Sequence, residues 1–369
     1  MNKRYTVFHV VSSLEIGGAE RVAINIAKSG NKVFDYHVVE VVQGHSGFSD
    51  ALKKELNAQD IKYHTSPIRQ NKLAIVFFPF WFFILCFRHS PNIIHVHTEI
   101  PDLACSLFRI SFGLLTRISK PFPRYIRTIH NTELWGGWKL VGKLVERYYR
   151  KHHSNVAISQ STCESYEREY GQTDIPVIYN GLEEVQQKPF EHLVERKINI
   201  LFAGRLEYQK GIEQLTSVVE AFQDSTRYHF HIVGCGSNEK RLRMKLGDYA
   251  NVSLYDKIYG LSAYLNSFDY LFMPSNHEGL ALMPIEASLA HTPPIINRCP
   301  GLEETLPADW PLAVDNNSVE GFIGIFKNVL ENIDYDTLAE KAYRFAKEQF
   351  SIEVMQKKYE ELYLSESIK

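Results

Sequence analysis

Apolar runs of strand length alternate along the chain with longer amphipathic segments of helix length. In the first half, we expect strands at residues 5–12, 36–42, 61–65, 92–97, 124–129, 154–158 and 176–179. The pattern then restarts, with expected strands at 198–203, 228–233, 251–255, 269–273, 294–297 and 312–314. Strands that alternate with helices favour parallel sheets covered on both faces. Two successive series therefore predict two doubly wound α/β domains.

The length of the chain and one polar segment place the boundary between these domains. A chain of 369 residues exceeds one ordinary core and suits two domains of about 150–200 residues each. Residues 183–189 are mostly polar and end in a proline. We therefore expect an N-terminal domain at 1–183 and a C-terminal domain at 184–350. Helical patterns at 318–332 and 336–349 are expected to cover the second sheet.

The expected strand-to-helix junctions carry groups that suit an anionic ligand. Arg205 and Lys210 follow the run at 198–203, where a guanidinium and an ammonium could clamp a diphosphate. Glu278 and Glu286 bracket a small-residue turn and the start of an apolar helix. A helix N-terminus favours phosphate, and carboxylates accept hydrogen bonds from sugar or ribose hydroxyls. An isolated Glu before a helix is more often only a cap, but the clusters together indicate a sugar-nucleotide site.

Six motifs in order resemble the family-4 glycosyltransferases of the GT-B fold. They are Gly17-Gly18-Ala19-Glu20-Arg21, Ile129-His130-Asn131, Val177-Ile178-Tyr179-Asn180-Gly181, Ala203-Gly204-Arg205-Leu206 with Lys210-Gly211, Ile232-Val233-Gly234-Cys235-Gly236, and the spaced pair Glu278 and Glu286. The resemblance implies two Rossmann-like domains that face each other across a cleft, an acceptor-binding one followed by a nucleotide-sugar-binding one. It also implies that a last helix at 351–369 crosses back to the N-terminal domain.

The same resemblance implies a retaining transfer of a sugar from a nucleotide-diphosphate sugar, without a metal or other cofactor. His130, Glu278, Arg205 and Lys210 are the expected catalytic residues. The expected donor-binding residues add Gly17, Gly18, Lys257, Ile258, Gly279, Leu280, Ala281, Leu282 and Glu286. Among them, Arg205, Lys210 and Gly18 would hold the diphosphate, Glu286 the ribose, and the segment of Lys257 and Ile258 the base. Glu278 and the N–H groups of 279–282 would hold the sugar and the phosphate.

Two departures from the family pattern concern small residues. Ala281 stands where the family usually has a second glycine, and His291 stands where a glycine often precedes Thr-Pro.

His95 and His97 lie on alternate positions of one expected strand and so face the same side. No further ligand is evident beside them, so we expect structural histidines and no metal site, with the acceptor side as an alternative place for His97.

Composition and charge bear on where the protein works. The formal net charge is only −2, yet residues 66–151 hold 13 Lys and Arg against 4 Asp and Glu. Five cysteines without any CxxC pairing indicate reduced thiols. Asn2-Lys3-Arg4 leads into a short strand pattern and not into a signal-length apolar helix. These features predict a cytoplasmic protein that meets an anionic surface or ligand.

Residues 73–87 form fifteen uncharged positions interrupted by Pro79, short of the roughly 20 that a spanning helix needs. One interpretation is a core helix that covers the first sheet. The other is an interfacial helix in the segment 73–127 that dips into a bilayer, which an all-round apolar helix slightly favours. Its basic neighbours would be Arg109, Arg117, Lys120, Arg124 and Arg127.

The leading hypothesis is a glycosyltransferase that acts on a hydroxyl of a lipid-linked or polysaccharide acceptor in bacterial cell-surface glycan biosynthesis. The main alternative is a non-catalytic partner of the same fold that binds a sugar nucleotide or another transferase. Another GT-B enzyme, such as an epimerase or a phosphorylase, is a further alternative. Nucleic-acid binding is disfavoured, because the basic segment is interleaved with an apolar helix and carries no stacking motif.

Overall fold

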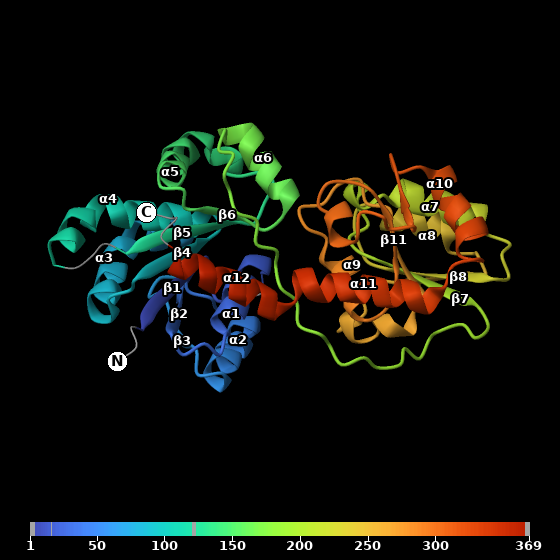
Figure 1. Cartoon of the computed structure of the whole chain (residues 1–369), viewed down its shortest axis with the longest axis horizontal. Coiled ribbons are helices and arrows are strands. Elements are labelled where there is room, and N and C mark those ends of the chain that lie inside the picture. Colours follow the sequence, from blue (N-terminus) through green and yellow to red (C-terminus); the bar gives the residue numbers. More distant parts are fainter. Residues whose placement is uncertain (1–3, 16, 120–122, 366–369) are drawn as a thin grey trace. The chain divides into compact units, whose positions relative to one another are not determined.

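The protein, seen here as a computed structural model, divides into two compact units, each built on one parallel sheet (Figure 1). The structure describes residues 4–15, 17–119 and 123–365, with no side chains described at 114–119. Unit 1 comprises Met1–Ile158, Thr162–Gly181 and Ile352–Lys369, and unit 2 comprises Ser159–Ser161 and Leu182–Ser351. The change at Gly181 and Leu182 lies two residues before the predicted boundary. The short segment Ser159–Ser161, which groups with unit 2, was not predicted.

Unit 1 has a six-stranded sheet in the order β3-β2-β1-β4-β5-β6. The strands are β1 (Tyr5–Val11), β2 (Phe34–Glu40), β3 (Lys62–His64), β4 (Ile93–His97), β5 (Arg124–Ile129) and β6 (Asn155–Ala157). The helices are α1 (Gly18–Ala27), α2 (Gly47–Ala58), α3 (Asn71–His89), α4 (Glu99–Ser119), α5 (Lys139–Lys151), α6 (Gln160–Tyr170) and α12 (Ile352–Leu364). Every strand pair is parallel, so each strand returns through a helix as the alternating pattern predicts.

Unit 2 repeats this topology, with the order β12-β11-β10-β7-β8-β9. The strands are β7 (Ile198–Ala203), β8 (Tyr228–Val233), β9 (Val252–Tyr255), β10 (Tyr270–Met273), β11 (Pro294–Asn297) and β12 (Ala313–Val314). The helices are α7 (Ile212–Ala221), α8 (Glu239–Leu246), α9 (Leu282–Leu289), α10 (Val319–Gly324), which continues as the π-helical turn Ile325–Val329, and α11 (Tyr335–Phe350). All six predicted strands of the second half are present. The fold class of two Rossmann-like sheets is confirmed.

One predicted strand is wrong. Residues 176–179 form only an isolated bridge between Val177 and Ala157. The N–H of Ile178 donates to the Ala157 carbonyl, but the preceding Pro176 has no N–H with which to extend a ladder. The apolar run therefore passes the edge of the sheet without becoming a strand.

Helix α12 belongs to unit 1, although it lies at the far end of the sequence. It packs beside α1 (Figure 1). Met355, Tyr359 and Tyr363 are buried in one core cluster with Val7 of β1. The guanidinium of Arg124 on β5 donates to the Leu362 carbonyl at 2.7 Å. This helix therefore supplies part of the first unit's core.

Helix α3 has features of both structures that were considered for the apolar segment, a core helix and an interfacial helix. It continues through Pro79, and its inner face buries Phe78, Phe82 and Leu85 against the sheet and α4. Its outer face exposes Leu73, Val76, Phe77, Phe80, Ile84 and Phe87. Among the described residues, α3 alone passes a test of length and composition for a membrane span, with a third of that window buried. The helix is thus a core element that also carries an exposed apolar stripe.

The basic neighbours predicted for a membrane surface are partly wrong. Arg127 is buried and forms ion pairs at 2.7 Å with Asp102 and with Glu146. Arg124 points to the carbonyls at the end of α12, and Arg109 lies over the Tyr148 ring. The side chain of Arg117 and the whole of Lys120 fall outside the described residues. Burial of Arg127 follows from its place inside a central strand, where it neutralises two carboxylates.

Candidate active site

The predicted donor residues of unit 2 surround its topological switch point. Strands β7 and β10 are neighbours, but the chain leaves β7 towards β8 and leaves β10 towards β11. Ligands of open α/β sheets bind in the crevice that such a divergence leaves at the carboxyl ends of the strands. Arg205 and Lys210 follow β7, and Glu278 follows β10. The strand order therefore brings the two loops of the prediction to one point.

Lys210 and Glu278, which are 68 residues apart, form the central contact of this edge. The Lys210 Nζ donates to Glu278 Oε1 at 2.6 Å, and the side chains are 17% and 7% exposed. The prediction assigned the lysine to phosphate and the glutamate to sugar, and the structure joins them to each other. Among the described residues no group donates to Glu278 Oε2, which leaves that oxygen as an acceptor beside the ammonium.

Two glycines allow the loops to approach so closely. Gly211 has φ 67°, and a Cβ there would lie 1.6 Å from the Pro274 carbonyl oxygen. Gly301 has φ 76°, and a Cβ there would lie 2.3 Å from the Glu278 carbonyl oxygen. A side chain at either position would require a backbone shift as well as a disfavoured dihedral. The position of the loops in this site therefore depends on these glycines.

Arg205 lies at the exposed rim of the same loop. Its Nη2 donates to Gln209 Oε1 at 3.1 Å. Gln209 in turn donates to the His277 carbonyl, and the Asn276 N–H donates back to the Gln209 carbonyl at 2.8 Å. The guanidinium is thus held near the loop of Glu278, and the residue as a whole is exposed.

The backbone donors at the start of α9 differ from the prediction at one position. The Ala281 N–H donates to the Gly301 carbonyl at 2.8 Å, so it is engaged within the protein, and the donor-binding role of Ala281 stays a prediction. Within the part of the chain that is described, the N–H groups of Gly279, Leu280 and Leu282 donate to no other group. Ala281 has φ −77° and a buried methyl group, so the change from glycine causes no backbone strain.

His291, the second departure from the family pattern, behaves differently. It has φ 57°, a region that glycine adopts far more easily than a branched or large side chain. Its ring stacks on Tyr343 with centroids 4.2 Å apart. A glycine position is therefore occupied by a residue whose side chain has gained a packing partner.

Glu286 lies on α9 next to the loop that follows β9. Its Oε2 accepts a hydrogen bond from Ser262 at 2.8 Å, and burial raises the pKa of its carboxyl. Ser262 comes shortly after Lys257 and Ile258, the predicted base-binding segment. Lys257 is exposed above the Tyr259 ring, and Ile258 packs partly against the core. The residue predicted to bind the ribose and the segment predicted to bind the base are therefore close together in unit 2. Ser262, which joins them, was not among the predicted site residues.

In unit 1, the glycine turn lies at the carboxyl end of β1, beside that sheet's own switch point between β1 and β4. Gly17 precedes α1 in an extended conformation, and a Cβ there would meet the Glu20 carboxylate at 2.1 Å. Gly18 is exposed, and a Cβ there would meet nothing within 4 Å. Gly18 is thus the one of the two whose backbone is open to a ligand. Its role in donor binding stays a prediction.

His130 ends a row of three hydrogen-bonded imidazoles. Its Nε2 lies 3.2 Å from His97 Nδ1, and His97 Nε2 lies 3.1 Å from His9 Nδ1. His9 and His97 are fully buried, whereas His130 is half-buried at the carboxyl end of β5. Burial lowers the pKa of His9 and of His130 to about 3 and that of His97 well below its usual range. All three rings are therefore neutral near pH 7.

The row determines which nitrogen of His130 carries its proton. In the part of the chain that is described, His9 Nε2 is buried without a partner. An orphaned buried N–H is rarer in proteins than an orphaned acceptor, so His9 is expected to carry its proton on Nδ1 and to donate to His97. His97 then donates from Nδ1 to His130 Nε2, which leaves His130 with an N–H at Nδ1. That group is a hydrogen-bond donor, the role predicted for this residue.

His95 is not part of the row. Its Nδ1 lies 2.6 Å from the Tyr363 hydroxyl and its Nε2 lies 2.7 Å from Thr128 Oγ1. This agrees with a structural histidine. His97 also faces inward and contacts His130, and the sequence pattern gave no sign that His9 would join them from another strand.

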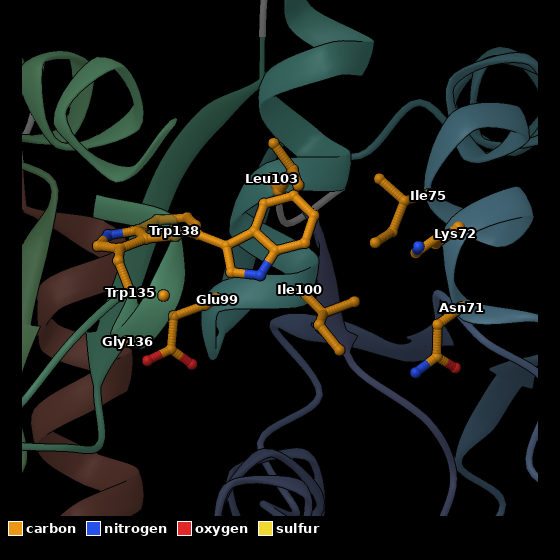
Figure 2. A pocket seen from close by; sticks show the side chains of 10 residues that line it. Asn71, Lys72, Ile75, Glu99, Ile100, Leu103, Trp135, Gly136 and Trp138 are labelled. Carbon is orange, nitrogen blue, oxygen red and sulfur yellow. The ribbon is translucent and has the colours of Figure 1, made fainter. Parts of the chain in front are cut away.

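A cavity of about 360 Å³ opens beside the loop that follows His130 (Figure 2). Trp135 and Trp138 lie on one side of it, and Ile75 and Lys72 of α3 lie on the other (Figure 2). Asn71, Glu99, Ile100, Leu103, Gly136 and Gly137 complete its lining. Trp135 Nε1 donates to Glu146 Oε1 at 2.6 Å, which fixes the indole. The prediction missed this cavity, although two tryptophans around Gly136-Gly137 directly after a strand were a usable signal.

Comparison with known proteins agrees with this architecture. The family model described as "Glycosyltransferase Family 4" matches residues 16–185, and the model "Glycosyl transferases group 1" matches residues 184–349. Together they span most of both units.

Individual proteins are similar over most of the chain. The chain is 26% identical over 300 residues to a "41.2 kDa protein in cps region" of Klebsiella pneumoniae, covering 74% of this chain and 79% of that one. It is 24% identical to the "Capsular polysaccharide biosynthesis glycosyltransferase CapH" of Staphylococcus aureus, covering 76% and 78%. The structure of Anabaena Alr3699/HepE in complex with UDP superposes with a TM-score of 0.75 and 17% identity, covering 97% and 99%.

Proposed function

The chain belongs to the family-4 glycosyltransferases of the GT-B fold, and from that premise we propose that it transfers a sugar, with retention of anomeric configuration, from a nucleotide-diphosphate sugar to an acceptor hydroxyl. The acceptor is a lipid-linked glycan or a polysaccharide in bacterial cell-surface glycan biosynthesis. The names of the relatives support this setting, since one is a capsular polysaccharide glycosyltransferase and another lies in a cps region.

The observation that carries the proposal is the Lys210–Glu278 pair at the switch point of unit 2. A carboxylate with one oxygen held by an ammonium and the other open can accept from a sugar hydroxyl while the ammonium faces a phosphate. The open N–H groups of Gly279, Leu280 and Leu282 add donors at the N-terminus of α9. Such donors stabilise an anionic leaving group most where the site is already rigid.

The reaction proceeds in one front-side displacement. The acceptor oxygen forms its bond to the anomeric carbon on the face from which the nucleoside diphosphate departs. The C–O bond to the β-phosphate breaks, and a departing phosphate oxygen takes the acceptor proton. Arg205 and Lys210 neutralise the charge that develops on the diphosphate. His130 donates its Nδ1–H to the sugar or the phosphate.

Transfer is proposed to need no metal. Among the described residues, groups of three potential ligand atoms occur only in unit 1 and not beside Lys210 or Glu278. The cationic side chains and the helix N-terminus supply the positive charge that a divalent ion would otherwise bring to a diphosphate.

The acceptor is proposed to approach from an anionic membrane, at the cytoplasmic face, through unit 1. The exposed stripe of α3 presents three phenylalanines among its six apolar side chains. Leu140 and Leu144 of α5 are also exposed, and Lys139, Lys143 and Arg147 share that outer face. Apolar side chains that insert below headgroups and cations that meet anionic lipid reinforce each other. The cavity of Trp135 and Trp138 is lined by the first turn of α3 and precedes α5, so it adjoins both elements.

Calorimetry tests the donor site. UDP-, GDP- and ADP-sugars are titrated into the protein with EDTA present, and the one that binds is repeated with Lys210→Ala. We expect metal-free binding of one nucleotide that the substitution weakens strongly. Lys245→Ala is the matched control, because Lys245 pairs with Glu220 on the surface of the same unit. Absence of binding for all three nucleotides, or equal loss in both variants, would contradict the donor assignment.

Vesicle flotation tests the membrane proposal separately. We expect the protein to float with vesicles that contain phosphatidylglycerol and to stay behind with phosphatidylcholine alone. Phe77→Ser combined with Phe80→Ser should abolish flotation, since both side chains are more than half exposed on α3. Met244→Ser, at a side chain 76% exposed in unit 2, should leave it unchanged. Flotation that survives the double substitution would exclude α3 as the contact.

A further inference from the structure

Two clusters of three histidines lie in unit 1, and they differ in what their ring nitrogens do. Each cluster has three potential ligand atoms within 4.8 Å of one another. In the first cluster, His95 and His97 use both ring nitrogens in hydrogen bonds to neighbouring side chains. A metal ion there would have to break those bonds. The nitrogens of His95 and His97 in the first cluster are therefore already engaged.

The second cluster consists of His37 on β2, His64 at the end of β3 and His89 at the end of α3. His37 Nδ1 lies 2.8 Å from His64 Nε2, and the His89 ring lies 4.9 Å from the His37 ring and 5.0 Å from the His64 ring. Within the described residues, no group makes a hydrogen bond to His89, and His37 Nε2 is buried without one. Among the described residues, an ion in the second cluster would therefore displace one hydrogen bond, that between His37 and His64, while the His89 nitrogens are free.

We propose that His37, His64 and His89 bind a transition-metal ion, with Zn²⁺ as the physiological type, that fastens the end of α3 to β2 and β3. Three imidazoles suit Zn²⁺, Co²⁺ or Ni²⁺ and not the oxygen-preferring Mg²⁺ or Ca²⁺. Tetrahedral Zn–N bonds of about 2.0–2.1 Å set the nitrogens about 3.4 Å apart. The existing spacing is within a small side-chain movement of that value. A water molecule would take the fourth position.

The surroundings of His37 support a ligand role. Asp35 Oδ2 lies 3.4 Å from His37 Nε2 without a hydrogen bond in this structure, and a small movement on metal binding would let it accept the N–H and direct Nδ1 towards the ion. Ligating histidines commonly have such a carboxylate partner. Lys62 holds both oxygens of Asp35 at 2.8 Å. Lys62 and Arg88 are the nearby cations, and both are exposed, so water screens their repulsion of the ion.

The ion at this site would stabilise the fold of unit 1 and would take no part in sugar transfer. His64 and His89 are half-buried, so the ion can enter from solvent. The helix that it fastens is the one with the exposed apolar stripe. The proposal is independent of the donor site, because all three ligands belong to unit 1.

Metal binding to the full chain, prepared without an affinity tag of histidines and stripped with EDTA, tests the proposal. ZnCl₂ is titrated by calorimetry, and CoCl₂ by visible absorption, which reports tetrahedral nitrogen coordination. We expect one ion per chain and a rise in the melting temperature with Zn²⁺. His89→Ala should weaken binding more than about a hundredfold, and Asp35→Asn by about 10–100-fold, as is typical of an outer carboxylate.

His45→Ala is the matched control, since His45 is a surface histidine with a side chain 69% exposed and should leave binding unchanged. His64→Ala serves as a second ligand variant if His89→Ala unfolds. No binding of Zn²⁺ or Co²⁺ at millimolar concentration would overturn the proposal. Binding that survives both ligand substitutions, or that falls equally in His45→Ala, would overturn it as well.

Discussion

The two units share one strand order and differ in the chemistry at the carboxyl ends of their strands. In unit 2, a lysine–glutamate pair lies between loops that two glycines hold in close contact. In unit 1, the corresponding edge is built from the imidazoles of buried His9 and His97 and of half-buried His130. One edge therefore presents fixed charge, and the other presents neutral donors and acceptors. The same topology supplies two different kinds of binding surface because the loops and strand ends, not the sheet, carry the chemistry.

The units also differ in what they expose. Unit 1 carries the apolar stripe of α3 together with the leucines of α5, whereas the exposed large apolar side chains of unit 2 are scattered singly. A contiguous exposed patch indicates an interaction site, and single exposed apolar residues do not. This contrast favours unit 1 as the unit that meets the acceptor.

Acidification should produce the largest difference in stability between the two units. The pKa values of His9 and His130 are lowered to about 3, and those of His95 and His97 lie well below their usual range. Between about pH 6.5 and 3 the unfolded chain therefore binds more protons, and stability falls as the pH falls, by about 1.4 kcal/mol per pH unit for each histidine. Asp102, with a pKa raised to about 7, opposes this, as do Glu20 and Glu40, whose pKa values burial also raises. In unit 2, the lowered His229 and His231 are offset by the raised Asp269 and Glu286.

We expect unit 1 to lose about 5 kcal/mol or more between pH 7 and 4 and to unfold at a higher pH than unit 2. Tryptophan fluorescence distinguishes them, because Trp310 is in unit 2 and the other three tryptophans are in unit 1. A Trp310→Phe variant reports unit 1 alone. Coincident transitions in the variant and in the parent protein would refute the difference.

Gly211→Ala should damage unit 2 while leaving unit 1 intact. The added Cβ would lie 1.6 Å from a backbone oxygen at φ 67°, so we expect a loss of about 4 kcal/mol or more. Urea unfolding measures it, with the contribution of Trp310 obtained as the difference in fluorescence between each protein and its Trp310→Phe form. Gly324→Ala is the control, because its φ of −61° is helical and nothing lies within 4 Å of the new Cβ. Its effect should stay within about 1 kcal/mol.

Lys210→Ala should lower kcat by about 10²–10³-fold, as loss of one group that stabilises the leaving charge does. The unit should stay folded, because the lysine is at the edge of the core and only Glu278 loses a partner. Transfer from the nucleotide sugar identified by calorimetry provides the measurement. A fall in stability that matches the fall in activity would instead assign the pair a structural role.

His97→Phe should have the smallest effect, about tenfold in kcat, the value of one hydrogen bond. It removes the group that holds the proton of His130 on Nδ1. Nitrogen-15 spectra of labelled histidine should then show His130 changing its tautomer. His95→Asn is the matched control, because His95 is equally buried but bonds to Thr128 and Tyr363. An unchanged His130 tautomer in His97→Phe would disprove the row of imidazoles.

Local patterns predicted most of the architecture. Twelve strands were expected correctly from apolar runs, because burial on both faces of a parallel sheet requires nearly continuous hydrophobic sequence. The one wrong strand, 176–179, has the same local pattern but lies beside β6 at the edge of the sheet. Pattern alone does not distinguish a strand from an apolar segment that touches a sheet once.

The sequence by itself determined which loops follow which strands, and so placed Arg205, Lys210, Glu278 and His130 at strand ends. These features are local, since they depend on neighbours within a few positions. Only the tertiary structure decided the partners, such as Lys210 with Glu278 and His9 with His97. Strand order brings residues 68 and 88 positions apart to within hydrogen-bond distance, and strand order follows from the packing of the whole unit. The same packing turned Arg127, expected at a surface, into a buried partner of Asp102 and Glu146.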